Sequence, residues 1–255
     1  MADRTVYAQG TPCWVDLTTP DPENAQRFYG ELFGWQFSTG DDDEYGYPTA
    51  SVQGAKVAGL TAATGPGQPT GWICYLASED VDETAQRIRD HGGQIRTDPM
   101  DVLGAGRMCV AEDPSGAVFG VWEAGRLVGA EKVNEPGTLC WNEVSSPVND
   151  DFYPAVFGVK TEQIGDGVNF DYTVFLVDGR QVAGHLRTGE DSDAPAQWMN
   201  YFAVDDCDKA AEKVAELGGS VDQGPFDSPY GRIAVLSDPS GASFSIMQLA
   251  ENPPS

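Results

Sequence analysis

Two acidic residues stand at matching places in two similar stretches of the sequence. Asp16 lies in CWVDLTT and Glu143 in CWNEVSS, and each follows a tryptophan, Trp14 or Trp141, by two residues. Residues two apart in a strand point to the same side, so each carboxylate shares a face with an indole ring. Burial among rings raises the pKa of a carboxylate toward the range of a general base. Alternatively, each is a polar residue satisfied by tyrosine hydroxyls or water, and the sequence leaves both interpretations open.

Other residues that could do chemistry are few. The chain has two histidines and five cysteines, and the cysteines show no CxxC spacing. An odd number of scattered cysteines predicts neither a disulfide framework nor a thiolate zinc site. No GxSxG motif or phosphate-binding glycine loop occurs. His91 ends a predicted helix, where a histidine interacts favourably with the helix dipole. His185 follows an Ala-Gly pair on a predicted strand and is a candidate ligand contact.

The segments that carry these residues repeat along the chain. The stretch from Trp72 to Gly93 resembles the stretch from Trp198 to Gly219, FYGELFGW resembles FYPAVFGV, and EDPSGAVFG resembles SDPSGASFS. Such self-similarity predicts a duplicated architecture. We expect one unit at 1–125, a linker at 126–137 and a second unit at 138–255. The length suffices for two ordinary domains, or one large one, with a core of its own in each.

Each unit divides again into two modules with the same order of elements. CWVDLTT alternates apolar and polar residues as a strand does, and DPENAQRFYGELFG has the three- and four-residue spacing of a helix that ends at glycine. Strands at about 35–39, 46–52 and 55–61 follow. We expect an α+β fold of four βαβββ modules, at about 11–62, 71–124, 138–188 and 197–250. Two paired modules would form a curved sheet with helices outside and a concave cavity inside.

The sequence resembles the vicinal oxygen chelate superfamily, which includes glyoxalase I, extradiol dioxygenases, and the bleomycin and fosfomycin resistance proteins. The resemblance rests on the phrase D-x-x-x-A-x-x-FY-x-x-x-FGW from Asp21 to Trp35, on the Ala-Gly pairs at 58–59 and 183–184, and on the two DPSG turns. It covers essentially the whole chain and implies two tandem units of this fold. It leaves the function open, because one fold hosts many chemistries.

The resemblance also implies where metal ligands would stand. Metal-binding members take them from the first strand of each module and from the closing strand. Divalent metals there need histidine nitrogens or carboxylate oxygens. The corresponding positions carry other side chains, so we expect neither a metal nor another cofactor: Trp14, Ile73 and Gly120 in the first unit, and Trp141, Met199 and Ser245 in the second.

Strand alternation around these positions predicts the lining of each cavity. Aromatic rings with one carboxylate suit a flat, largely apolar ligand that carries a hydroxyl, an amine or a cation, and small residues at Gly120 and Ser245 leave room for it. The alternative is that the tryptophans fill collapsed cavities as core. The candidate ligand-binding residues are Trp14, Asp16, Tyr75, Trp122, Trp141, Glu143, His185, Met199, Tyr201, Ser245 and Met247.

The charge of the chain excludes some partners. The formal net charge is -25, and such a field repels nucleic acid and anionic membrane surfaces. No apolar run approaches the length of a membrane span, and the N-terminal stretch lacks the apolar core of a secretion signal, so we expect a cytoplasmic protein. We expect a small-molecule partner, and either a monomer with an internal pseudo-dimer or a homodimer.

These observations predict a metal-independent protein of the glyoxalase and bleomycin-resistance type. It would bind a small aromatic or hydrophobic metabolite or antibiotic, as in sequestration or resistance. The alternative is a metal-free lyase, isomerase, cyclase or hydroxylase-like enzyme of secondary metabolism that uses Asp16 or Glu143 as its base. In a third possibility, one half has lost its ligand and serves as a structural partner.

Overall fold

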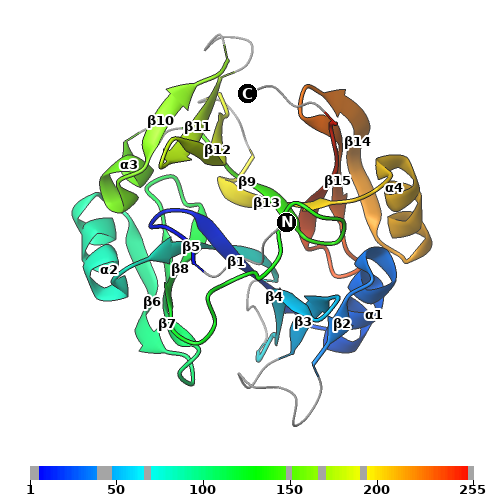
Figure 1. Cartoon of the computed structure of the whole chain (residues 1–255), viewed down its shortest axis with the longest axis horizontal. Helices are drawn as coiled ribbons and strands as arrows, with labels where there is room; N and C mark the ends of the chain where they lie inside the picture. Colours follow the sequence, from blue (N-terminus) through cyan, green and yellow to red (C-terminus); the bar gives the residue numbers. More distant parts are fainter. Residues whose placement is uncertain are drawn as a thin grey trace.

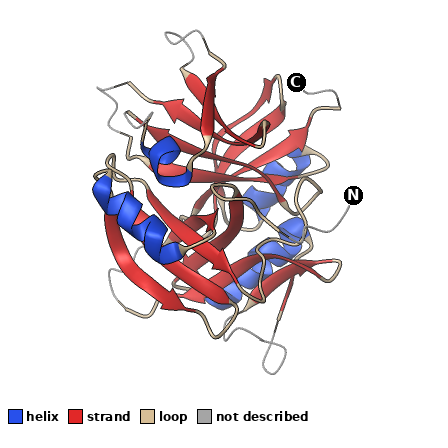
Figure 2. Ribbon diagram, turned by 60° about the vertical axis from the view of Figure 1, so that its left-hand side comes forward, coloured by secondary structure: helices blue, strands red, loops and turns tan. Residues whose placement is uncertain are grey.

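The computed structural model describes residues 6–38, 48–65, 70–147, 151–165, 171–189 and 194–251. These residues form two open eight-stranded sheets and four helices (Figures 1 and 2). Sheet A holds the strands of the first unit and sheet B those of the second. The predicted α+β fold of two tandem units is therefore confirmed.

The strand order in sheet A is β2-β3-β4-β1-β5-β8-β7-β6, so its two modules meet along β1 and β5. The predicted order of elements holds in both modules. Their bounds are β1 Pro12–Thr19, α1 Pro22–Phe33, β2 Gln36–Phe37, β3 Thr49–Val52, β4 Ala55–Ala62, β5 Gly71–Ser78, α2 Val81–Asp90, β6 Gln94–Asp101, β7 Gly106–Glu112 and β8 Val118–Ala124.

Sheet B repeats this arrangement in the order β10-β11-β12-β9-β13-β16-β15-β14. Its first helix, α3, has 6 residues where α1 has 12, which agrees with the shorter spacing in the sequence. The bounds are β9 Leu139–Ser146, α3 Phe152–Phe157, β10 Lys160–Gln163, β11 Tyr172–Val177, β12 Arg180–Arg187, β13 Gln197–Ala203, α4 Cys207–Glu216, β14 Ser220–Ser228, β15 Gly231–Ser237 and β16 Ser243–Leu249.

The duplication extends to the pairing of individual residues. Trp14 lies opposite Tyr75 across β1 and β5, and Trp141 lies opposite Tyr201 across β9 and β13. A β-bulge follows at the same place in both ladders. The central strand pairs of the two concave faces therefore have the same residue pairing and the same irregularity.

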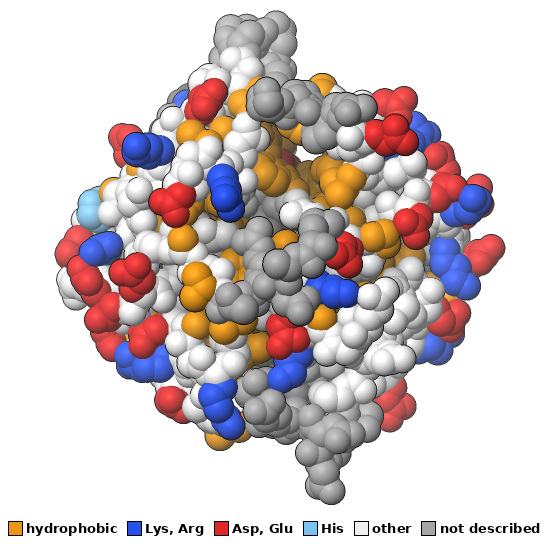
Figure 3. Space-filling view, in the orientation of Figure 1, with side chains coloured by type: hydrophobic (Ala, Val, Ile, Leu, Met, Phe, Trp, Pro, Cys, Tyr) orange, Lys and Arg blue, Asp and Glu red, His pale blue; other side chains and the backbone are white. Residues whose placement is uncertain are grey.

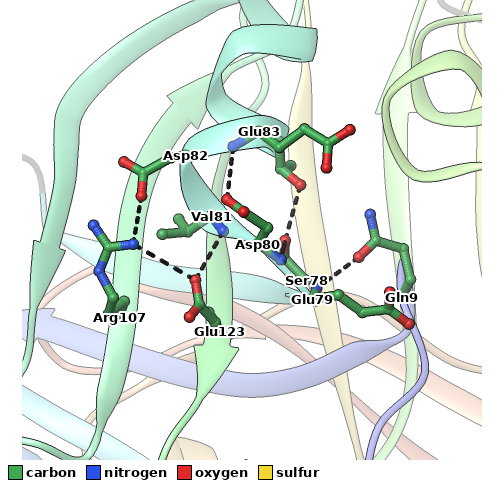
Figure 4. A network of polar contacts seen from close by, with 10 residues as sticks. Gln9, Ser78, Glu79, Asp80, Val81, Asp82, Glu83, Arg107 and Glu123 are labelled. Carbon is green, nitrogen blue, oxygen red and sulfur yellow. Dashed lines mark hydrogen bonds and ion pairs between the residues drawn. The ribbon is translucent and has the colours of Figure 1, made fainter.

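Aspartates at the module joints start the helices. Asp80 accepts a hydrogen bond from the backbone N–H of Glu83 at 2.8 Å and so caps α2, while Glu123 on β8 accepts one from the N–H of Val81 at 2.9 Å (Figure 4). Arg107 on β7 is ion-paired with Asp82 and, at 3.7 Å, with Glu123. The four unpaired N–H groups of a helix start need such acceptors, so these acidic residues serve the fold.

The helices lie on the convex sides of the sheets, between the two units. α1 packs beside α4, and α2 packs beside α3 (Figures 1 and 2). One apolar core combines α1, β1 and β4 with α4, β15 and β16, and the other combines α2, β7 and β8 with α3, β11 and β12. The two units therefore share these two cores, because each module buries its helix face against a module of the other unit. No helix in the described part of the chain is long and apolar enough to span a bilayer.

The repeated FY and DPSG motifs meet across this interface. Tyr29 donates its hydroxyl to Asp238 at 3.1 Å, and Tyr153 donates to Asp113 at 2.9 Å. Each tyrosine oxygen accepts a hydrogen bond from an indole N–H: Trp72 at 3.0 Å and Trp198 at 2.9 Å, respectively. The motifs that repeat most clearly in the sequence therefore join the two units.

Candidate functional site

The first candidate carboxylate lies on the concave face of sheet A. Trp14 Nε1 donates a hydrogen bond to Asp16 Oδ1 at 2.9 Å, and Tyr75 also donates to this carboxylate. Burial raises the pKa of Asp16 from 3.8 to about 6, and the two hydrogen bonds oppose that shift only in part. Asp16 keeps some exposed surface, although many protein atoms surround its carboxyl group.

The aromatic part of this face is filled by the chain itself. Leu127 and Ala130, from the connection after β8, pack in one buried cluster with Trp14, Tyr75 and Trp122. The three rings are only 2, 4 and 5% exposed, in that order. Figure 1 shows this connection in bright green, crossing in front of sheet A. The alternative of a collapsed cavity describes this part of the first unit.

Hydrogen bonds fix the connection in place. Trp122 Nε1 donates to the carbonyl of Leu127 at 2.9 Å, and the Ala130 N–H donates to the carbonyl of Cys13 at 2.7 Å. Tyr7 donates its hydroxyl to the carbonyl of Ala130 at 2.6 Å. We call Leu127 and Ala130 the plug; their backbone N–H and carbonyl groups all have hydrogen-bond partners within the protein.

The small residue on the closing strand does not leave room for a ligand in this unit. A side chain at Gly120 would collide with the ring of Tyr75, because that ring lies flat over the glycine. The expectation of free space at Gly120 is therefore wrong, and the space holds Tyr75 instead.

Removing the charge of Asp16 should stabilise the fold at neutral pH. The folded state holds the Asp16 proton more tightly than the unfolded chain, so stability falls as pH rises from about 4 to about 6 and the carboxylate ionises. We expect Asp16→Asn to be more stable than the wild type by about 1–3 kcal/mol at pH 7.5, and equally stable near pH 4. Urea denaturation at both pH values measures the difference. Equal stability at pH 7.5 would show that burial does not disfavour the ionised form.

The second candidate carboxylate lies at the equivalent place in sheet B and has a richer set of donors. Tyr201 donates its hydroxyl to Glu143 Oε1 at 2.8 Å, and Tyr172 donates to Oε2 at 2.9 Å. Trp141 Nε1 donates to the Tyr172 hydroxyl at 2.8 Å. Burial raises the pKa of Glu143, and the two tyrosine hydroxyls oppose that shift. Three aromatic side chains therefore surround one carboxylate.

The sequence alone did not predict Tyr172 as a site residue, because it reaches Glu143 from β11, two strands away from β9. It stands on β11, and its ring crosses β12 at Gly184, where any side chain would overlap the phenol. Gly184 lies opposite Glu143 in the sheet, so the glycine opens the path between them. The Ala-Gly pair was the available signal, since a glycine within a strand often marks a close approach.

The lining of sheet B is more accessible than that of sheet A at its tryptophan, since Trp14 is buried, while Asp16 and Ile73 of sheet A are half-buried like their counterparts. Trp141 and Met199 are half-buried, as is Glu143, whereas Tyr201 and Met247 are only 8 and 6% exposed and form the floor with the buried Ser245. Figure 3 shows a hollow with hydrophobic side chains around it in this region, between β12 and β14–β15 of Figure 1.

A pocket of about 190 Å³ adjoins this lining. Trp141 belongs both to the pocket wall and to the Glu143 network, so the two are neighbours. The other wall residues come from the N-terminal segment, the first residue of β1, the linker, β9 and β12, and they include Tyr7, Val133, Asn134, Cys140 and Val182.

His185 does not belong to this site. It lies opposite Val144, one residue away from the Gly184–Glu143 pair, so its side chain points to the convex face. It is 1% exposed and hydrogen-bonds Ser146 Oγ at 2.9 Å, and burial lowers its pKa. The expectation that His185 faces the second cavity is wrong, because the register of β12 against β9 turns it the other way.

The family's metal positions do not fit a divalent metal in this chain. Trp14 and Trp141 use their indole N–H groups as donors, to Asp16 and Tyr172, and the ring of Tyr75 covers Gly120. Among the residues that the structure describes, no three His, Cys, Asp or Glu side chains gather in a group that could hold a metal ion. The donor set offers one carboxylate per sheet with aromatic neighbours, which is not a metal cage.

Solved structures share this fold at low sequence identity. The Mn(II)-bound glyoxalase from Novosphingobium aromaticivorans superposes with a TM-score of 0.64 at 19% identity, covering 97% of this chain and 85% of its own. The 2,3-dioxygenase LapB from Pseudomonas sp. KL28 gives 0.64 at 15% identity, covering 97% and 96%. At these identities the likeness concerns the fold alone.

Relatives with higher identity extend over nearly the whole chain. CFP32 of Mycobacterium tuberculosis, provisionally named a glyoxylase, is 40% identical over 260 residues, which cover 98% of this chain and 99% of CFP32. The anthracycline biosynthesis protein DnrV of Streptomyces peucetius is 38% identical over 269 residues, covering 98% and 97%. The model of the Glyoxalase/Bleomycin resistance protein/Dioxygenase superfamily matches residues 12–121 and 149–246. The chain therefore belongs to this superfamily.

Proposed function

We propose that the chain binds a small aromatic or hydrophobic metabolite on the concave face of its second unit, without a metal. The observation that carries the proposal is the contrast between two equivalent tryptophans. Trp14 is 2% exposed beneath the linker, whereas Trp141 is half-buried and borders a pocket of about 190 Å³. Indole and phenol rings around an accessible face supply the contact area that a flat ligand needs.

The plug in the first unit supports this choice of ligand. Leu127 and Ala130 bring apolar atoms onto Trp14 and Tyr75, and the carbonyl of Leu127 accepts a hydrogen bond from Trp122. The duplicated face thus accommodates an apolar body with a polar group at its edge. A metabolite with the same properties suits the second face, where Met247 replaces Trp122.

The names of the relatives support the class of ligand. DnrV is named for anthracycline biosynthesis and is 38% identical over 98% of this chain. Anthracyclines are planar aromatic compounds, and the half-buried ring of Trp141 offers a surface for such a body beside the more buried rings of Tyr172 and Tyr201. Binding would sequester or present such a compound.

A metal-free enzyme is the second candidate, and the perturbed carboxylates favour it. Burial raises the pKa of Asp16 to about 6 and also raises that of Glu143, as a general base near neutral pH requires. A lyase, isomerase, cyclase or hydroxylase-like reaction that begins with proton abstraction would use one of them. An enzyme should convert its bound compound and should lose turnover in Asp16→Asn or Glu143→Gln while binding persists.

Titration with planar aromatic natural products tests the proposal. Bound compounds should quench tryptophan fluorescence and raise the melting temperature, and mass spectrometry of the recovered compound separates binding from turnover. If a broad panel produces neither effect, the binding function is abandoned.

Metal content provides an independent prediction. Because the family's ligand positions carry Trp14, Trp141 and Gly120 among others, the purified protein should contain no stoichiometric divalent metal. A chelator should leave its melting temperature unchanged. Elemental analysis that finds close to one Zn, Ni, Mn or Fe per chain would contradict this.

A further inference from the structure

Glu143 is a carboxylate without a cationic partner among the residues that the structure describes. Its hydrogen bonds come from the neutral hydroxyls of Tyr172 and Tyr201. Glu143 is half-buried, and carboxylates withdrawn from water are normally paired with a charge, because burial removes part of their hydration. The ionised form of Glu143 therefore lacks a counter-charge in the described part of the protein, and a bound cation would supply one.

The described lysines and arginines of the second unit are directed elsewhere. Arg180 and Lys160 are exposed, at the start of β12 and on the edge strand β10. The others form ion pairs away from Glu143: Arg187 with Asp171 at 3.1 Å, Lys209 with Asp206 at 2.7 Å, Lys213 with Glu31 at 3.5 Å, and Arg232 with Asp208 at 2.6 Å.

The rings around Glu143 suit a cation as well as an apolar body. Trp141, Tyr172 and Tyr201 come from three different strands and are tied together by hydrogen bonds of 2.8–2.9 Å. Aromatic faces attract cations, and the attraction is strongest where water is excluded. Each oxygen of Glu143 accepts one tyrosine hydroxyl, and a carboxylate oxygen can accept a further donor.

The electrostatic field of the whole chain also favours a cationic ligand. The formal net charge of -25 raises the local concentration of cations and repels carboxylates and phosphates. An anionic ligand at Glu143 would meet both this field and the carboxylate itself.

We infer that the ligand of the second unit is an organic cation, a planar apolar body with a protonated amine that lies against Glu143 within the Trp141, Tyr172 and Tyr201 rings. This rests on the proposed binding function and narrows its ligand class. The equivalent carboxylate in the first unit is less suited to such a ligand, because Leu127 and Ala130 pack in one buried cluster with the rings of Trp14 and Tyr75.

Three matched probes test the inference on the full chain: 2-naphthylmethylamine, 2-naphthylmethanol and 2-naphthoate. They share one aromatic body and differ in charge. In calorimetric or ligand-observed NMR titrations at pH 7, the wild type should bind the amine about tenfold or more tightly than the alcohol and should bind the naphthoate most weakly. Added salt should weaken binding of the amine and leave binding of the alcohol nearly unchanged.

Two variants locate the effect. Glu143→Gln keeps the size of the side chain and removes its charge, so the amine should lose its advantage while the alcohol binds as before. Glu162→Gln removes one charge from exposed β10 of the same sheet and controls for the overall field; the amine preference should persist.

The outcomes separate the cation inference from the proposed binding function. Equal binding of amine and alcohol by the wild type, or an amine preference that survives Glu143→Gln, overturns the cation inference and leaves the binding function standing. Tightest binding of the naphthoate also overturns it. If none of the three binds, the cation inference fails; the binding function fails as well when the broad panel of aromatic compounds produces neither quenching nor a higher melting temperature.

Discussion

Replacing Asp238 or Asp113 with alanine should lower the free energy of unfolding by about 3–5 kcal/mol. Asp238 accepts three hydrogen bonds: from the backbone N–H groups of Ser240 at 2.8 Å and Ala242 at 2.9 Å, and from the hydroxyl of Tyr29 at 3.1 Å. Alanine would leave these donors without their acceptor in a buried place, since Asp238 is 4% exposed. Hydrogen bonds to charged groups contribute about 1.5–3 kcal/mol each and are not additive.

Asp113 has the equivalent partners in the duplicated arrangement: two N–H groups of its own turn and a tyrosine of the other unit. Its carboxylate accepts from the N–H groups of Ser115 and Ala117 at 2.8 and 3.0 Å, and from the hydroxyl of Tyr153 at 2.9 Å. Similar losses are therefore expected from Asp113→Ala and Asp238→Ala, although the two turns belong to different units.

The shape of the unfolding curve is part of this prediction. Each apolar core takes elements from both units, so both variants should unfold in one transition with a lower urea midpoint. Asp98→Ala is the control, because Asp98 pairs with Arg89 at 3.0 Å on the surface and such pairs contribute at most about 1 kcal/mol. Two separate transitions, each sensitive to only one variant, would show that the units unfold independently.

Trp14→Ala should mainly lower stability and Trp141→Ala should mainly lower affinity, although the two tryptophans are equivalent by duplication. Trp14 is 2% exposed in a packed cluster, and its loss should cost about 3–5 kcal/mol of stability. Trp141 is half-buried at the pocket, so its loss should cost less stability. The Trp141→Ala variant should lose affinity for a planar aromatic ligand by about tenfold or more, since lost area and stacking amount to about 1–3 kcal/mol.

Parallel measurements on the two variants check this contrast. Urea denaturation gives the stability of each, and calorimetric titration with 2-naphthylmethanol gives the affinity at a temperature where both remain folded. If Trp14→Ala loses affinity while Trp141→Ala binds normally, the ligand lies in the first unit. If both variants lose only stability, the tryptophans are core and the binding function is wrong.

Much of the fold follows from the sequence alone. The similarity of the Trp72 and Trp198 stretches, the alternation in CWVDLTT and the helical spacing after Asp21 predict the four modules and the order of their elements. These features are local or repeated, so they can be read without knowledge of contacts. The types of the residues at the family's metal positions, such as Trp14 and Trp141, were likewise available from the sequence.

Only the tertiary structure decided which concave face is filled and which carboxylate is enclosed. Leu127 and Ala130 close the first face because the linker folds back over it, and Tyr172 reaches Glu143 because Gly184 leaves space for its ring. His185 points away because a strand turns successive side chains to opposite faces, and only the register against β9 determines which face it takes. Each of these outcomes depends on contacts between segments far apart in the chain, which leave no periodic signal in the sequence.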